Sequence, residues 1–259
     1  MLNLLKADFY RIIKSKILKA SLILAVILPL IFSLMYYGVA KIAEHTNEAE
    51  ALAITSMFTG RRLIAASFSL TDNFGLILPI FGAIFVSSDL KNGTLRNKII
   101  SGHDRKSIFL SHLITSIAYY LVIIAIYTSF TALFSCLFLG YGEFNGKELI
   151  YILIIGFTSF IFVATISTLF NLLINSTPLA IVLTIVCCLG ISFICTIVSL
   201  LDYEKYKTLV YFIPLFANSA MSASSIPNEL FVEGIISIFV FSAINTLLGL
   251  YIFAKKDLK

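Results

Sequence analysis

The chain has 259 residues, of which 59% are hydrophobic and only 13% are charged, and its formal net charge is +5. Soluble proteins average about 45–50% apolar and about 25% charged residues, so this composition predicts an integral membrane protein. It excludes a soluble nucleotide-binding domain of about 200 residues beside the membrane segments.

Residues 1–19 are predicted to form an amphipathic helix at the membrane interface. In the segment LNLLKADFYRIIKSKI, helical spacing places the apolar residues on one face: Leu2, Leu5, Phe9, Ile12 and Ile13. The polar residues fall on the opposite face: Asn3, Asp8, Arg11, Lys14 and Ser15. We expect the helix to lie in the inner leaflet. A plain basic anchor for the first span is a compatible alternative.

Charge-free windows predict an all-α membrane protein with six transmembrane helices, because a charge in mid-span costs about 2.5–3.5 kcal/mol. The windows are residues 20–40, residues 73–88 with a start near Leu70, residues 107–142, two helices within residues 149–201, and residues 234–254. The two helices of the fourth window are separated at NLLINSTP, residues 171–178, where two Asn and a Pro interrupt the apolar pattern.

Residues 208–228 form a further charge-free window with a different character. They include Pro214, Asn218, Pro227 and four serines, and only residues 210–217 are strongly apolar. A full span needs about 20 mostly apolar residues. We therefore expect a re-entrant or interfacial hairpin that dips in from outside before the sixth span.

The distribution of charge predicts the orientation. With the N-terminus inside, the cytoplasmic pieces hold 13 of the 19 Lys and Arg residues but only four of the 14 acidic residues. The positive-inside rule therefore places both the N- and C-termini in the cytoplasm. Membrane topology also accounts for the basic net charge, so nucleic acid is not an expected partner.

A basic polar segment, residues 89–106, separates the second and third spans. A turn at residues 92–94 precedes a short helix, residues 94–101, with Leu95 and Ile99 on one side. Gly102 is a natural terminator for this helix, and Asp104 is placed to cap the next one. From the residues alone, an ordinary positive-inside loop of a pore or a receptor explains the segment equally well.

Motifs for catalysis are absent from the sequence. It contains no GxxxxGK[ST] phosphate loop, no HExxH and no GxSxG. Its three histidines are scattered and its four cysteines all lie in apolar runs, so neither a metal site nor a disulfide framework is expected. The chain is therefore not predicted to be an enzyme or to hold a cofactor.

The whole chain resembles the permease subunit of ABC-2-type ATP-binding-cassette transporters. The sharpest local match is DLKNGTLRNKIISGHDRKSIFLSHL, residues 89–113, which is similar to the family's acidic–x3–Gly-Thr coupling segment, here Asp89, Gly93 and Thr94, followed by a basic turn into the third span. The resemblance implies a single permease domain over residues 1–259, in the cell membrane of a bacterium.

The resemblance also implies partners and roles. Residues 89–106 would dock into a cleft on a separate cytoplasmic ATPase subunit, which carries ATP and magnesium. Two such subunits would serve a permease dimer, formed with a second copy or a homologue. Leu95 and Ile99 would form an apolar knob, and the charged rim would consist of Arg96, Lys98, Arg105 and Lys106.

Few polar residues interrupt the predicted spans, so the expected cargo is hydrophobic or amphipathic: a peptide toxin, a bacteriocin or an antibiotic. Candidate pathway residues are Asn171, Asn175 and Asn245, although an interhelical hydrogen bond is the alternative role for Asn245. Candidate external gate residues are Asp72, Phe212 and Phe216. The alternative functions are a sodium or small-ion exporter permease and a non-transport membrane sensor or scaffold.

Overall fold

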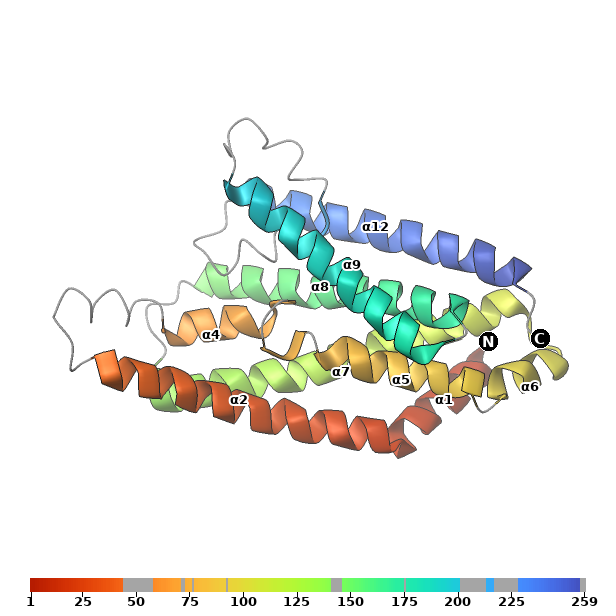
Figure 1. The fold of residues 1–259 in the computed structure, drawn as a ribbon, viewed down its shortest axis with the longest axis horizontal. Helices are drawn as coiled ribbons and strands as arrows, with labels where there is room; N and C mark the ends of the chain where they lie inside the picture. The colour runs from red at the N-terminus through yellow and green to blue at the C-terminus, as the bar shows by residue number, and fades with distance from the viewer. Residues whose placement is uncertain are drawn as a thin grey trace.

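The computed structural model describes residues 1–43, 58–70, 73–75, 77–91, 93–140, 146–174, 176–200, 213–216 and 228–256. Within these ranges every regular element is a helix (Figure 1). The helices are α1 (Leu2–Lys14), α2 (Lys16–Ala43), α4 (Gly60–Ser67), the 3-10 helix η1 (Asn73–Gly75), α5 (Ile77–Lys91), α6 (Thr94–Ile100), α7 (Arg105–Leu139), α8 (Gly146–Leu173), α9 (Thr177–Leu200) and α12 (Asn228–Lys255).

Five helices are long and apolar enough to cross a membrane. They are α2, α7, α8, α9 up to Cys195, and α12 from Phe231. The expectation of an all-α, membrane-embedded protein is therefore confirmed, and these five helices match five of the predicted spans. The count of six spans and the orientation in the membrane stay predictions.

The predicted second span differs from a regular membrane helix. Its helix α5 has 15 residues and an apolar stretch of only Ile77–Ser88. At 1.5 Å per residue α5 is about 22 Å long, which is shorter than a hydrocarbon core of about 30 Å. The chain completes this passage along the bundle with α4 and η1, which precede α5 (Figure 1).

The break between α4 and α5 is packed inside the bundle. Phe68 contacts Phe157 of α8 edge-on at 5.4 Å between ring centroids, and Phe74 stacks on Tyr127 of α7 at 4.8 Å. A side chain at position 75 would collide with the backbone oxygen of Ser69. Only glycine fits at position 75, because the chain passes so close to the backbone of Ser69.

Small residues allow the helices to approach closely. Four of the five buried residues of α2 are spaced one turn apart: Ser21, Ala25, Pro29 and Ser33. The helix on which α2 packs most extensively is α7. On α8, Gly156 leaves room for the ring of Phe68. Small residues at interfaces are typical of helix packing in membranes, where dispersion forces between close backbones hold helices together. Helix α8 is the most buried of the five long helices and contacts α5, α7, α9 and α12.

The beginning of α1, helix α6 and the end of α12 lie at one end of the bundle (Figure 1). Arg105, which begins α7, donates two hydrogen bonds to the end of α12. The acceptors are the carbonyl oxygens of Ala254 in its last turn (3.2 Å) and of Lys256 just after it (2.6 Å). Lys256 in turn donates to the carbonyl of Leu172 at the end of α8 (2.9 Å). Both ends of the described chain thus lie on the same side as the basic segment.

Candidate functional site

Helix α6 is defined at both ends by glycine. Gly93, at φ 66°, precedes its first residue Thr94, and Gly102, at φ 86°, follows its last turn. The amide of Gly102 donates to the carbonyl of Ile99 (3.0 Å) and the amide of His103 donates to that of Lys98 (3.2 Å). This pair of bonds is the Schellman arrangement that terminates helices, so the prediction for Gly102 is confirmed.

Helix α7 begins at Arg105 with Asp104 at its N-cap, as expected, but the Asp104 side chain makes no capping hydrogen bond. The side chain of Asp89 lies outside the described residues. The turn between α5 and α7 is therefore positioned mainly by the two glycines and by the contacts that α6 makes with α5 and α7.

The two faces of α6 differ from the expected ones. Leu95 is only 2% exposed and belongs to the core of the bundle, and Ile99 packs against that core. In this structure they support α6 from beneath and do not present an apolar knob to a partner. The exposed face consists of Arg96, Asn97 and Ile100, and Ile100 is 74% exposed.

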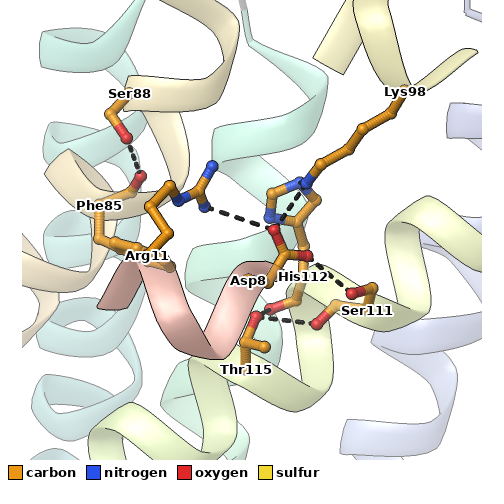
Figure 2. A network of polar contacts seen from close by, with 8 residues as sticks. All are labelled: Asp8, Arg11, Phe85, Ser88, Lys98, Ser111, His112 and Thr115. Atoms are coloured by element: carbon orange, nitrogen blue, oxygen red, sulfur yellow. Dashed lines mark hydrogen bonds and ion pairs between the residues drawn. The ribbon is translucent and has the colours of Figure 1, made fainter. Parts of the chain in front are cut away.

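Lys98 points inward to a buried carboxylate instead of outward to a charged rim. Its Nζ donates to Oδ1 of Asp8 at 2.7 Å, and Asp8, on α1, is 1% exposed. The hydroxyl of Ser111, on α7, donates to the other carboxylate oxygen at 2.7 Å (Figure 2). A single carboxylate thus joins α1, α6 and the first turns of α7.

Two more side chains complete this cluster. Arg11 lies one turn beyond Asp8, with Nη2 at 3.8 Å from its carboxylate, and its guanidinium stacks over the ring of Phe85 of α5 at 4.6 Å. The Nζ atom of Lys98 is also 3.4 Å from Nε2 of the fully buried His112. Asp8, Arg11, Lys98, Ser111 and His112 are called the Asp8 cluster below.

The electrostatics of the Asp8 cluster favour an ionised carboxylate. Burial raises the pKa of Asp8, but the neighbouring His112 and the hydrogen bonds from Lys98 and Ser111 lower it by more, so the pKa lies below its ordinary value of 3.8. The stability that ionised Asp8 contributes is therefore present above pH 3.8 and is lost as the pH falls through the lower folded value. Burial lowers the pKa of Lys98 more than its bond to Asp8 raises it.

Of the two other residues predicted for the charged rim, Arg105 and Lys106, Lys106 is exposed as expected. Arg105 is half-buried and caps the end of α12 through the bonds described above. Cations at the C-terminus of a helix satisfy its free carbonyls and interact favourably with its dipole. Arg105 therefore connects α7 to α12, and its guanidinium is engaged within the chain.

A partly open groove of about 400 Å³ lies between α8, α9, α12 and the turn at residues 213–216. Helical spacing places its lining on one face of each helix: Phe162, Ile166, Leu169 and Phe170 on α8, Cys187, Ile191 and Ile194 on α9, and Phe241 and Asn245 on α12. Ile213 and Pro214 complete the lining. Asn245 is the single residue with a polar amide among the described residues of this lining.

The two candidate pathway residues that the structure describes, Asn171 and Asn245, do not line the same groove. Asn245 lines the groove, but Asn171 is fully buried and turns its amide back to Ser167 of its own helix, at 2.7 Å from the carbonyl oxygen. Asn175 lies outside the described residues. The hydroxyls of α8 behave like Asn171, since Thr165 and Thr168 also bond to carbonyls of their own helix.

The candidate external gate is described only in part, because Asp72 and Phe212 lie outside the described residues. Phe216 is buried, and its amide donates to the carbonyl of Ile213 at 3.3 Å. This turn contains Leu215 at φ 75°, a left-handed conformation that costs a non-glycine residue about 1–2 kcal/mol. The described part of residues 208–228 is thus a tight turn whose first residues line the groove.

Asp8 is the functional candidate that the sequence pattern misses. The expectation that it lies on an exposed polar face is wrong, because α1 buries Leu4, Asp8 and Ile12, which are spaced one turn apart. The sequence does contain a signal for burial of Asp8. Its carboxylate lies between two apolar residues of one helical stripe, and four basic residues occur nearby in residues 6–16. A buried acid is expected to have a cationic partner.

No described group of three or more His, Cys, Asp or Glu side chains is arranged to hold a metal ion. A comparison of the chain with models of known protein families finds no match, and a comparison with curated proteins finds none either. The Asp8 cluster beneath α6 and the groove around Asn245 are the candidate functional features of the described residues.

Proposed function

We propose that this chain is the permease subunit of an ATP-driven exporter of the ABC-2 type. The observation that carries the proposal is the position of α6, a short helix held between α5 and α7 and bound to α1 through Lys98 and Asp8. Its outer face remains exposed, with Arg96, Asn97 and Ile100. A force on this face is transmitted to three other helices at once.

In this proposal a cytoplasmic ATPase subunit docks on the exposed face of α6. The ATPase binds ATP and magnesium, and its nucleotide-driven closure moves α6 together with α1, α5 and α7. A motor shifts a conformational equilibrium only through contacts that differ between the two states. In this proposal the differing contact is the one between the ATPase and α6, and the attachment of α6 to α1, α5 and α7 passes its movement to the bundle. The working transporter has two ATPase subunits and this permease with a second copy or a homologue.

The cargo in this proposal is hydrophobic or amphipathic, such as a peptide toxin, a bacteriocin or an antibiotic. The groove supports this class of cargo, because its described lining is apolar except for one amide. Apolar pockets with few polar groups are typical of sites for small hydrophobic ligands. Ion pathways in membranes are usually marked by ionisable side chains within the spans, whereas each of the five long apolar helices has an 18-residue window with at most two charged residues.

The proposal is tested by purifying the tagged protein from its own cells in mild detergent and identifying what copurifies by mass spectrometry. The test variant is Arg96→Glu with Ile100→Asp, because both side chains are exposed and their replacement leaves the core intact. Lys6→Glu is the matched control, since it reverses an exposed charge on α1 without touching α6.

We expect an ATPase subunit, with measurable ATP hydrolysis, to copurify with the wild type and with Lys6→Glu but not with the double variant. The permease is expected to elute as a single species in all three samples, at a smaller size in the double variant because the ATPase is absent. The proposal is wrong if no ATPase accompanies the wild type, even when proteins are cross-linked in the cells before solubilisation. Retention of the ATPase by the double variant would place the docking surface elsewhere.

A further inference from the structure

The amide of Asn245 lacks a hydrogen-bond partner among the described residues, although the residues around it are almost entirely apolar. Within the part of the chain that the structure describes, Asn245 therefore does not form the interhelical hydrogen bond that is the usual role of a polar residue in a membrane helix. An amide in an apolar medium without a partner costs several kcal/mol. Such a group points to a ligand that supplies the missing bonds.

The depth of Asn245 limits what this ligand is. Ten residues separate Asn245 from Lys255 at the end of α12, which corresponds to about 15 Å along the helix. Half of the hydrocarbon core has the same thickness, so Asn245 lies near the middle of a bilayer. The ester carbonyls of ordinary phospholipids lie at the edge of that core and do not reach this depth.

The lining defines the rest of the ligand. Aromatic and branched side chains from three helices, among them Phe162, Phe170 and Phe241, provide a surface for an alkyl or aromatic body. The described lining contains no charged side chain, so it offers no partner for a carboxylate or an ammonium group. An Asn side chain donates and accepts together, which matches the donor and acceptor of a carboxamide.

We infer that the groove binds a membrane-partitioned apolar molecule that carries one uncharged carboxamide, and that Asn245 is its hydrogen-bonding contact. As the cargo site of an exporter, the groove rests on the proposed function above. As a binding site, it can be tested on this chain alone, because the described lining comes from α8, α9, α12 and residues 213–214.

The absence of tryptophan from the sequence allows a direct binding measurement. Phe241→Trp places a single fluorophore in the groove, and Phe239→Trp places one on the same helix at a site that is 52% exposed. Each purified protein, without any ATPase, is reconstituted in nanodiscs of unbrominated phosphatidylcholine. Quenching is then recorded as dibromostearamide is added, with dibromooctadecane as the analogue that lacks the amide.

We expect dibromostearamide to quench the Phe241→Trp reporter with a saturating curve and the Phe239→Trp reporter only in proportion to its concentration in the bilayer. Adding Asn245→Leu should weaken the saturable quenching about fivefold, the effect of losing one hydrogen bond. Asn245→Gln, which keeps the amide, should retain most of it. Quenching by dibromooctadecane should not depend on residue 245.

Equal quenching curves for the two reporters, or no effect of Asn245→Leu in a protein that elutes as a single species, would overturn the inference. The ester carbonyl of a bilayer phospholipid is the alternative partner for Asn245. Nanodiscs made of brominated phosphatidylcholine test whether such a lipid occupies the groove. If it quenches the Phe241→Trp reporter selectively and through Asn245, the occupant is a bilayer lipid and the cargo assignment fails. If binding is saturable but no ATPase copurifies, the proposed exporter function is wrong and the binding site stands. If an ATPase copurifies but no saturable binding is seen, the binding site is wrong and the proposed function stands.

Discussion

A single carboxylate determines how α1 is attached to the rest of the protein. Asp8 is buried between Leu4 and Ile12 on the inner face of the helix, and both of its oxygens accept hydrogen bonds from other helices. Taking a carboxylate and an ammonium out of water costs several kcal/mol per ion, so the attraction between them offsets a large penalty. If one of the two ions is removed, the other stays buried and its desolvation cost is no longer offset.

The Asp8→Asn variant is therefore expected to lose about 3 kcal/mol of stability, because it leaves the Lys98 ammonium buried without its counter-charge. Thermal unfolding in detergent, followed by size-exclusion chromatography of the tagged protein, measures the loss. Asp104→Asn is the matched control. It removes an exposed carboxylate at the same end of the bundle that makes no capping bond, so its effect should stay within about 0.5 kcal/mol.

The double variant Asp8→Leu with Lys98→Met separates the two contributions to this effect. Removing both charges also removes the desolvation penalty, so the double variant should be markedly more stable than Asp8→Asn. A double variant as unstable as the single one would show that Asp8 acts through Ser111 and not through the ion pair.

At the scale of elements, the helices are predictable from the sequence but their faces are not. Charge-free windows identify the five long helices, and Gly102 marks the end of α6, because both signals are local. The inner face of α6 depends on which neighbours it meets. From the sequence, Leu95 and Ile99 are expected to form a docking surface. The same spacing equally suits packing of α6 onto the bundle, which is what the structure has.

The break between α4 and α5 is unpredicted for a similar reason. A hydropathy window registers the apolar character of residues 73–88 but not the collision that position 75 would have with the backbone at Ser69. The groove is likewise invisible in the sequence, since its lining comes from residues more than 70 positions apart, such as Phe162 and Asn245. Asn245 itself is recognisable as a polar residue within a span, but whether it has a partner depends on packing.

Close packing between elements gives a second prediction. Gly156→Ala places a methyl group against the ring of the fully buried Phe68, so it should destabilise the protein by about 1–3 kcal/mol. The control is Gly190→Ala on α9, where a new Cβ meets no atom within 4 Å. It should be neutral or stabilise the helix by up to about 1 kcal/mol. Equal effects of the two variants in the same thermal assay would refute the packing at position 156.

At the scale of the whole molecule, the basic residues of α1 and of residues 93–106 lie at the same end of the bundle as the two ends of the described chain. This end holds α1, α6 and the junction of α7 with α12 through Arg105 (Figure 1). The opposite end contains an ion pair between Arg61 of α4 and Glu148 of α8, at 3.1 Å. The positive-inside rule predicts that the first end faces the cytoplasm, and this orientation stays a prediction.

Labelling with a membrane-impermeant thiol reagent tests this orientation. The positions are the exposed residues Lys6, Lys106 and Lys147, each changed to Cys in a background that lacks the four native cysteines. Lys147→Cys should react in intact cells, whereas Lys6→Cys and Lys106→Cys should react only after permeabilisation. The reverse labelling pattern would show that the protein has the opposite orientation in the membrane. The proposed docking face of α6 would then lie outside the cell, where no ATPase can reach it.

The shortness of α5 has a consequence for biogenesis. Its apolar stretch, Ile77–Ser88, falls well short of the roughly 20 residues with which a nascent segment partitions into lipid by its own hydrophobicity. The strongly apolar α7 follows it closely in the chain, and α5 packs against α7 and α8 in the finished structure. We therefore expect α5 to leave the translocon together with later helices. Truncation of the nascent chain before α7 should leave this segment outside the bilayer.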